Sequence, residues 1–330
     1  MSQSGISLSI ALCTYNGARF LKAQLESFSA QTALPNELVV CDDDSTDESR
    51  QIVEEFARSA PFEVMLHHQP QRLGWKANRE DCYRRCRSSL IAASDQDDVW
   101  RPTKLARMAI ALQDSPQCLL AFNDCEVVDG ALHPLGYRAL AHSSLNEERE
   151  KQILNGDSLR ALLPNTPIAE ATMVFRASLL QAALPIPAEW LPDEWLCIVA
   201  AATGGCTIVP EPLQFYRQHH TNLLGARRKS PLQKYREAKD GSAAEYFVRQ
   251  ERHFEVLRDR LARQLAQPGG PAPLPGAIEL VEQRIAFTAA RRRMRQHPFQ
   301  RPWIILRELS QGNYHRMGTG WRTLLYDLLI

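Results

Sequence analysis

Hydrophobic and polar positions alternate in blocks along the first hundred residues. Four apolar runs have the length of strands and cover residues 6–12, 37–41, 62–67 and 89–93. Three segments between them have the length of helices and cover residues 17–31, 47–59 and 77–86. Pro102 stands where it fits the first turn of a further helix. This alternation predicts an α/β fold built on a parallel sheet with right-handed crossovers.

The pattern changes twice further along the chain. It loosens over residues 130–170, and then predicts an apolar segment at 171–175, a helix at 193–202 and a strand at 206–216. After residue 226 the chain is basic and helical, with a Pro- and Gly-rich break at 268–276. We therefore expect a large domain over residues 1–225 and a helical C-terminal extension over 226–330.

Composition fits a folded, globular chain. Of 330 residues, 44% are hydrophobic and 23% charged, which argues against disorder. The eight cysteines form no zinc-binding pattern and read as buried thiols. No signal peptide and no apolar run of about 18 residues is visible, so we expect a cytoplasmic protein. No nucleic-acid partner is expected.

The net charge of +1 hides an uneven distribution. Residues 1–225 hold 19 basic and 28 acidic residues, whereas residues 226–330 hold 20 and 10. A helix over the last ten residues would place Trp321, Leu324, Leu325 and Leu328 on one face. A basic segment with such a helix predicts a peripheral contact with the inner face of the cytoplasmic membrane. The alternatives are packing on the domain itself and a homodimer through these helices.

Candidate chemistry collects at the ends of the predicted strands. Ligands bind beyond the C-terminal ends of the strands in such a sheet. Three strands end there in polar residues: Thr14-Tyr15-Asn16, Asp42-Asp43-Asp44 and Asp95-Gln96-Asp97-Asp98. The last group has three carboxylates within four residues, which repel one another unless a cation relieves them. A divalent ion such as Mg²⁺ or Mn²⁺ takes oxygen ligands of this kind and also binds a diphosphate.

The other two strand ends suit a nucleotide. A carboxylate at 42 or 43 can accept a hydrogen bond from a pyrimidine N–H, and Tyr15 can stack on a base. The alternative for residues 14–16 is a plain turn between strand and helix, and for the acids a helix start that favours negative charge.

Two later sites complete the candidates. Asp193, at a helix start beside Trp195, could act as general base on an acceptor hydroxyl or simply cap the helix. Arg217, His219 and His220 follow a strand and form a basic cluster that could bind phosphate or metal. Structural roles for these side chains are the alternative.

Four segments in this order resemble the family 2 glycosyltransferases, especially their rhamnosyltransferase-like branch. They are ALCTYNGARFLKAQLESFSAQT, ELVVCDDDSTDES, SDQDDVWRPTKL, and PDEWLCIVAAATGG with EPLQFYRQHHTNLLGA, and together they span about residues 7–226. The resemblance implies the GT-A fold, a Rossmann-like mixed and mostly parallel sheet flanked by helices. It also implies a divalent cation and inversion at the anomeric carbon. A nucleotide-sugar half would cover about 1–130 and an acceptor half about 131–225.

The same resemblance implies roles for individual residues. Thr14, Tyr15, Asn16 and Asp42 or Asp43 would hold the nucleotide. Asp95 and Asp97 match the DxD motif, so Asp95 would contact ribose and both would meet the metal-bound diphosphate. Asp193 would be the catalytic base, while Arg217 and His219 would assist the diphosphate, His219 also as a metal ligand. Glu170 and Trp195 would lie in the acceptor region. Three positions depart from the pattern: Asp44 and Glu170 replace Gly, and Pro192 replaces a frequent His.

The expected activity is transfer of a sugar from a nucleotide-diphosphate donor, dTDP-rhamnose or a UDP-sugar. The acceptor would be a glycan or lipid-linked glycan in cell-surface polysaccharide synthesis. One rival is a phosphohydrolase of the haloacid dehalogenase type, since Asp95 to Val99 fit its D-x-D-x-V motif. That motif normally follows the first strand, and here three strands precede it. A second rival is a non-catalytic sugar-binding module, which would need neither Asp97 nor Asp193.

Overall fold

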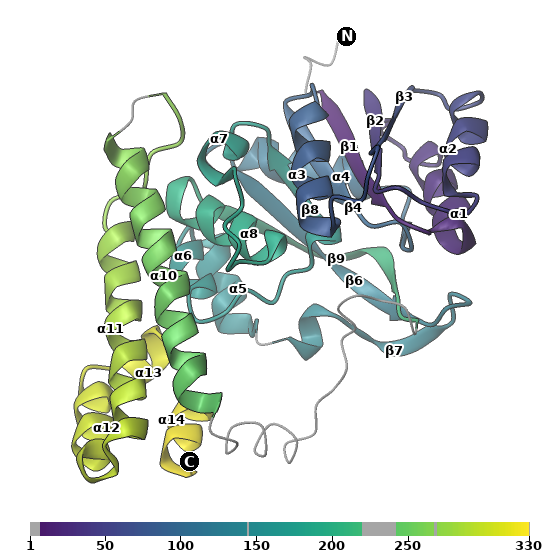
Figure 1. The fold of residues 1–330 in the computed structure, drawn as a ribbon. Coiled ribbons are helices and arrows are strands. Elements are labelled where there is room, and N and C mark those ends of the chain that lie inside the picture. Colours follow the sequence, from purple (N-terminus) through teal and green to yellow (C-terminus); the bar gives the residue numbers. More distant parts are fainter. Residues whose placement is uncertain (1–6, 144, 220–241, 267–268, 330) are drawn as a thin grey trace.

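The structure is a computed structural model that describes residues 7–143, 145–219, 242–266 and 269–329. Within these residues, nine strands form one sheet in the order β3-β2-β1-β4-β8-β6-β9-β5, with β7 paired to β6 (Figure 1). The strands are β1 Leu8–Thr14, β2 Glu37–Asp42, β3 Glu63–His68, β4 Leu90–Ser94, β5 Val99–Trp100, β6 Leu120–Val128, β7 Pro134–Arg138, β8 Met173–Arg176 and β9 Cys206–Arg217. The predicted fold class, a mixed and mostly parallel sheet flanked by helices, is confirmed.

The first four strands form the parallel half of the sheet. The crossovers between them are helices α1 Ala18–Ser29, α2 Ser49–Ala57 and α3 Trp75–Arg85. Strand β1 lies between β2 and β4, with Thr14 opposite Asp42 and Leu12 opposite Ser94. All four predicted strands are present. The register brings their polar ends to one edge of the sheet.

The second half of the sheet reverses direction. Strand β8 runs antiparallel to β4 and β6, whereas β9 runs parallel to β6 and antiparallel to the short β5. Strand β6 was not predicted from its sequence. Its buried Asn123 and Asp124 interrupt the apolar run that would have indicated a strand. Helix α4 Lys104–Asp114 begins two residues after the expected Pro102.

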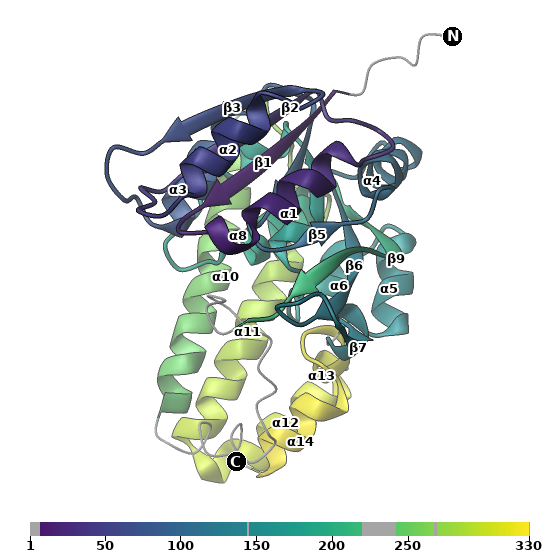
Figure 2. The same ribbon diagram turned by 90° about the vertical axis from the view of Figure 1, so that its right-hand side faces the viewer.

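Helices cover both faces of the sheet (Figure 2). On one face α1 and α4 pack through side chains such as Phe28 and Met108. On the other face the core contains Tyr83 of α3 and most of α8. The remaining helices of this part are α5 Glu147–Leu154, α6 Ser158–Leu162, α7 Leu179–Ala183 and α8 Pro192–Thr203, with 3-10 turns at η1 Leu140–His142 and η2 Glu170–Thr172.

The C-terminal helices pack on the face that carries α8. Phe254 and Leu257 of α10 join the core cluster of α8, and the His253 ring stacks on Trp190 at 5.1 Å. The predicted break falls between α10 and α11, and the predicted boundary near residue 225 lies outside the described residues. The elements are α10 Ser242–Ala266, α11 Ala277–Gln296, η3 Pro298–Gln300, α12 Arg301–Ser310, α13 Asn313–Arg316 and α14 Trp321–Leu329. None of the helices described has the length and hydrophobicity needed to cross a bilayer.

Part of the basic charge of this segment is neutralised internally. Arg291 pairs with Asp327 at 2.8 Å, and Arg292 pairs with Glu251 at 2.7 Å. The cluster at 227–229 lies outside the described residues. The face predicted for the last helix is divided, because Leu324 is 7% exposed while Trp321 is 67% exposed. Leu324 therefore packs inward, and its predicted neighbours on that face point outward.

Candidate active site

The turn after β1 is tied to the turn after β4 through Gln96. The Gln96 Oε1 accepts hydrogen bonds from Thr14 Oγ1 at 2.8 Å and from the Tyr15 backbone N–H at 2.9 Å. A Cβ at position 17 would lie only 2.2 Å from that oxygen, so this close approach needs Gly17. The predicted nucleotide residues Thr14 and Tyr15 are thereby fixed beside Asp95 and Asp97.

Further contacts fix the turn after β1 on its other side. Asn16 adopts a left-handed φ of 49°, and its Oδ1 accepts a hydrogen bond from the Thr46 N–H at 2.9 Å. The Tyr15 ring lies 3.9 Å from the guanidinium carbon of Arg72. Arg72 comes from the loop after β3 and was not singled out by the sequence. One face of the predicted stacking residue is therefore covered by a cation.

Asp42 and Asp43 both hold backbone segments in place. Buried Asp42 accepts hydrogen bonds from the N–H and hydroxyl of Ser45. Asp43 accepts hydrogen bonds from the N–H groups of Leu73 and Gly74, at 2.7 and 3.0 Å. A carboxylate has about four acceptor positions, so Asp43 keeps room for the N–H of a base, whereas the Asp42 side chain has no exposed surface. Base recognition by either residue remains a prediction.

Asp44 explains one departure from the family pattern. Its φ is 64°, in the left-handed region that favours glycine and that aspartate tolerates better than most residues. The turn geometry that glycine usually supplies is therefore kept here by aspartate.

Arg79 joins the two halves of the site. Its guanidinium lies 2.5 Å from Asp95 Oδ1 and 3.1 Å from Glu170 Oε2, and it also donates to the Ser94 carbonyl. The Tyr83 hydroxyl donates to the other oxygen of Glu170. Burial raises the pKa of Glu170 to about 7, although Arg79 opposes the change. The contacts of Glu170 are with Arg79 and Tyr83, and its expected place in the acceptor region remains a prediction.

Asp97, in the turn after β4, faces His219, which follows β9. Their Oδ2 and Nε2 atoms are 2.8 Å apart, and the His219 ring stacks near Phe20 with centroids 4.6 Å apart. Burial and the neighbouring charge of Asp95 raise the pKa of Asp97, while His219 lowers it. The predicted pair of Asp97 and His219 is therefore brought together. His220 lies outside the described residues.

Arg217 holds the chain around this pair. Its Nε donates to the Asp97 carbonyl at 2.7 Å, and its Nη1 donates to the Gly130 carbonyl at 2.6 Å. Its guanidinium also lies over the Phe20 ring at 4.6 Å. Arg217 is near the expected diphosphate position, but these contacts make it a support for the Asp97 backbone.

Asp98, the third acid of the cluster, points into the core. It accepts hydrogen bonds from the Gln214 side chain at 3.0 Å and from the Arg217 N–H at 3.2 Å. The buried Lys104 donates to the Ala171 carbonyl close by. Asp98 therefore fastens β9 to the turn after β4 and is not available to a ligand.

The described side chains of the site provide an incomplete set of ligands for a divalent cation. Among the described residues, no group of three or more His, Cys, Asp or Glu side chains is arranged to hold a metal. The Asp97–His219 pair does fit a cation that takes its other ligands from a diphosphate and water, because hard divalent ions accept oxygen ligands and keep several waters. Asp95 lies near enough to raise the pKa of Asp97. These residues would hold a metal only together with a bound diphosphate.

Asp193 occupies the first turn of α8, after Pro192. Its Oδ1 accepts a hydrogen bond from the Glu194 N–H at 2.9 Å. Burial raises the pKa of Asp193 to about 6, and the charges of Glu194 and Asp95 act in the same direction. The charges of Asp95 and Glu170 interact with that of Asp193, and Arg79 joins those two acids directly; the role of Asp193 as catalytic base remains a prediction. Its pKa suits a group that takes up a proton near neutral pH.

The prediction for Trp195 is corrected by the structure. Its side chain is fully buried, its indole N–H donates to the Ala183 carbonyl at 2.6 Å, and its ring lies 5.4 Å from that of Trp190. A side chain without exposed surface cannot contact an acceptor. The sequence places Trp195 two residues from Asp193, which on a helix turns it to another face. Trp195 anchors α8.

Sequence reasoning missed Gln96, Arg72 and Arg79. Gln96 lies inside the DQDD segment, where only the acids were considered, although the glycine at position 17 indicates that another group approaches the backbone closely there. Arg79 lies on a predicted helix rich in arginine, where nothing local separates a buried arginine from an exposed one. Its role depends on Glu170, which is 91 positions away in the sequence.

Known proteins resemble this chain in sequence and in fold. Residues 9–169 match the family described as Glycosyl transferase family 2. The uncharacterized glycosyltransferase alr2836 of Nostoc sp. is 27% identical over 219 residues, which are 65% of this chain and 66% of that protein. The dTDP-rhamnosyl transferase RfbG of Shigella flexneri is 25% identical over 226 residues, 65% of this chain and 74% of that protein.

Among solved structures, TarS 1-349 of S. aureus in complex with UDP-GlcNAc superposes with a TM-score of 0.55 at 17% identity. The superposition covers 91% of this chain and 78% of that one, and at this identity it shows the fold. The chain spans slightly less than two thirds of the Nostoc relative. Residues 9–169, just under half of this chain, are therefore similar to glycosyltransferase family 2, and the chain has a GT-A-like fold.

Proposed function

We propose that this protein is an inverting, metal-dependent glycosyltransferase. It moves a sugar from a nucleoside diphosphate onto a hydroxyl of a glycan or lipid-linked glycan, in the synthesis of a cell-surface polysaccharide. The observation that most directly supports the proposal is the environment of Asp193. This buried carboxyl at the start of α8 has a pKa of about 6, and its charge acts on Glu170, which Arg79 joins to Asp95 on the proposed donor side.

The residues divide the reaction between two sides of the site. Asp193 takes the proton from the acceptor hydroxyl, and the oxygen forms a bond to the anomeric carbon. The bond from that carbon to the diphosphate oxygen breaks, and the electron pair leaves with the nucleoside diphosphate. One displacement of this kind inverts the anomeric configuration. Asp97 and His219, beside Asp95, would hold a divalent cation, which would supply charge stabilisation for the leaving diphosphate.

The donor is proposed to be dTDP-rhamnose or a UDP-sugar. Both carry a pyrimidine whose N–H can meet a carboxylate, and Asp43 retains acceptor positions beside the turn that holds Tyr15. The relation to the dTDP-rhamnosyl transferase RfbG supports rhamnose. Arg72 over Tyr15 offers a second planar surface against which a base or ribose can lie.

The experiment is a donor panel with purified protein and Mg²⁺ or Mn²⁺. Thermal shift reports donor binding, and release of the nucleoside diphosphate reports turnover. We expect one pyrimidine donor to stabilise the protein and to be turned over, and Asp193→Asn to keep the thermal shift while losing turnover. Phosphate release from monoesters without nucleotide-sugar turnover would favour the phosphohydrolase. Binding without turnover by the wild type would favour a sugar-binding module.

A further inference from the structure

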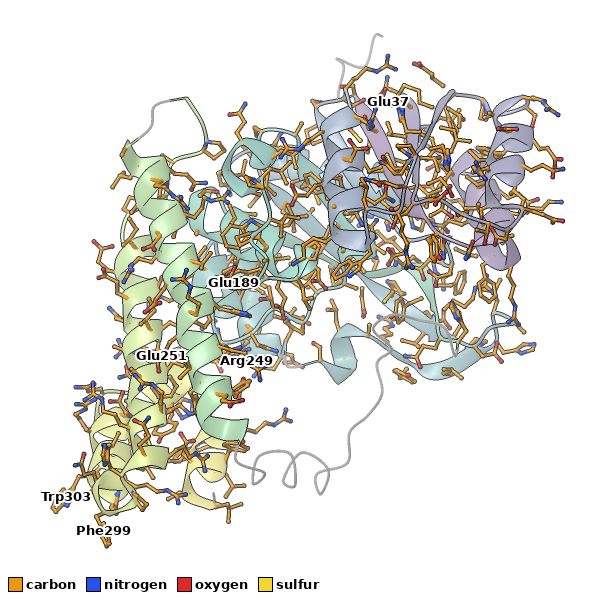
Figure 3. All side chains as sticks on the ribbon, viewed as in Figure 1. Glu37, Glu189, Arg249, Glu251, Phe299 and Trp303 are labelled. Carbon is orange, nitrogen blue, oxygen red and sulfur yellow. The ribbon has the colours of Figure 1, made fainter. Side chains whose placement is uncertain are left out.

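A large apolar surface lies at the C-terminal end of the molecule, and we call it the C-terminal apolar surface. Figure 3 shows Phe299 and Trp303 projecting from it. Phe299 is 97% exposed, Trp303 76% and Trp321 67%. The surface comprises Phe299, Trp303, Leu306, Trp321, Leu325, Leu328 and Leu329. Single exposed apolar residues are ordinary, but clustered ones mark an interaction site.

The helices that carry this surface expose more apolar side chains than they bury. In α14 the outward stripe consists of Trp321, Leu325 and Leu328, at helical spacing, whereas Thr323, Leu324 and Asp327 face inward and are buried. An amphipathic helix on a globular protein normally directs its apolar stripe at the core. Here only Leu324 does so, beside two polar side chains, and the larger apolar stripe is left for another partner.

The acidic residues of this segment are buried, which affects the charge of its surface. Between residues 297 and 329 the only acidic residues are Glu308 and Asp327, and each is 2% exposed. Asp327 pairs with Arg291 at 2.8 Å, and Glu308 pairs with Arg307 at 2.5 Å. The negative charges of this segment are therefore withdrawn from its surface.

The exposed charges of residues 297–329 are cationic, and the exposed acid Glu245 stands beside them in the first turn of α10. Arg293, Arg316 and Arg322 are exposed at this end. Arg301 at the start of α12 donates to the Asp327 carbonyl at 2.7 Å, which keeps the start of α12 against the end of α14. The surface thus combines aromatic and leucine side chains with arginines and shows no exposed acid among its described residues.

This combination selects a lipid surface over a second copy of the chain. A symmetric dimer would place the same patch against itself, so its arginines would meet arginines without exposed acids to balance them. An anionic bilayer takes leucine and tryptophan into its interface and attracts arginine at its headgroups. We propose that the C-terminal apolar surface binds the anionic face of a lipid bilayer.

The orientation is compatible with a lipid-linked acceptor. In Figure 1 the chain enters β1 at the top, β1 runs obliquely downward, and α12 and α14 lie at the bottom, while Figure 2 shows β1 running sideways as well as down. The edge of the sheet that carries the site is therefore turned only partly toward the end that carries the C-terminal apolar surface. Only this consequence rests on the proposed function, because bilayer binding itself needs no catalysis.

The test is co-sedimentation of the full chain with vesicles, without donor or acceptor. We expect it to pellet with phosphatidylcholine vesicles that contain phosphatidylglycerol, to stay in solution with phosphatidylcholine alone, and to be released by high salt. The double variant Trp303→Ser/Trp321→Ser should lower the partition coefficient about tenfold or more. Its control, Leu34→Ser/Ile110→Ser, makes similar exposed changes on the sheet domain and should bind like the wild type.

A second pair of variants tests charge. Arg293→Gln/Arg322→Gln should lower binding to the anionic vesicles about tenfold, whereas Lys22→Gln/Arg58→Gln, exposed elsewhere, should not. All four variants change exposed side chains, so circular dichroism should match the wild type. Equal binding to both vesicle types, binding to neither, or unchanged binding by the tryptophan variant would overturn the proposal. Dimerisation without vesicles that the tryptophan variant abolishes would assign the surface to a second copy instead.

Discussion

The sharpest prediction concerns the ionisation of Asp193. Replacing it with asparagine keeps the size of the side chain and the hydrogen bond from the Glu194 N–H, but it removes the charge and the ability to take up a proton. If Asp193 is the general base, kcat should fall roughly 10²-fold or more. Donor binding should be unchanged, because we place Asp193 on the acceptor side of the site.

The raised pKa of Asp193 also predicts how activity depends on pH. A base works in its ionised form, so activity should be full above about pH 7 and fall as pH drops through the pKa of about 6. At pH 5 about a tenth of Asp193 would be ionised, so kcat/KM should be about tenfold below its plateau. Because the charge of Glu194 raises this pKa, Glu194→Gln should move the inflection to lower pH.

The assay is nucleoside diphosphate release between pH 4.5 and 8 at a fixed low substrate concentration, since kcat/KM reports the free enzyme. Glu170, with a pKa of about 7, also titrates in this range and is the acid that Arg79 joins to Asp95. Glu170→Gln should therefore keep the acidic limb that Asp193→Asn removes. An acidic limb that survived in Asp193→Asn and vanished in Glu170→Gln would refute the assignment and point to Glu170 as the base.

Three further outcomes are expected. EDTA should abolish transfer and Mg²⁺ or Mn²⁺ restore it, and Asp97→Ala should remain folded but inactive; full activity in excess chelator would remove the metal assignment. Arg79→Gln should reduce the free energy of unfolding by about 3 kcal/mol, measured with urea, because it leaves buried Glu170 without its cation. Gly204→Ala should cost about 1–3 kcal/mol, because the added Cβ would lie 2.6 Å from Leu119 Cγ and 2.9 Å from a backbone oxygen; an unchanged midpoint would show that the loop yields freely.

The parallel half of the fold was predictable because its signals are local. Each of its strands is a continuous apolar run, and each is followed by a helix of ordinary length. The rule that ligands bind at the C-terminal edge then located Thr14, Asp42 and Asp95 correctly relative to one another. The short β5 and the polar-centred β6 lacked such signals, since their strand state depends on pairing with β9.

The candidate site was predictable in composition but not in contacts. Asp97 and His219 are 122 positions apart, and the order of the sequence motifs led us to expect them together. Motif membership, however, does not say which way a side chain points. Asp98 and Trp195 lie inside the same motifs and face the core, because neighbouring positions in a turn or helix point in different directions.

The charge of Asp95 acts on three other carboxyl groups of the site. Burial raises the pKa values of the carboxyls of Asp97, Glu170 and Asp193, and in each case the charge of Asp95 adds to the effect. His219 opposes the change at Asp97 and Arg79 opposes it at Glu170, but both pKa values remain raised. A donor that arrives with a divalent cation would supply further positive charge. Since the same charge would favour the ionised form of Asp193, we expect donor binding to prepare the base for the acceptor, which would link the two sides of the site through Asp95.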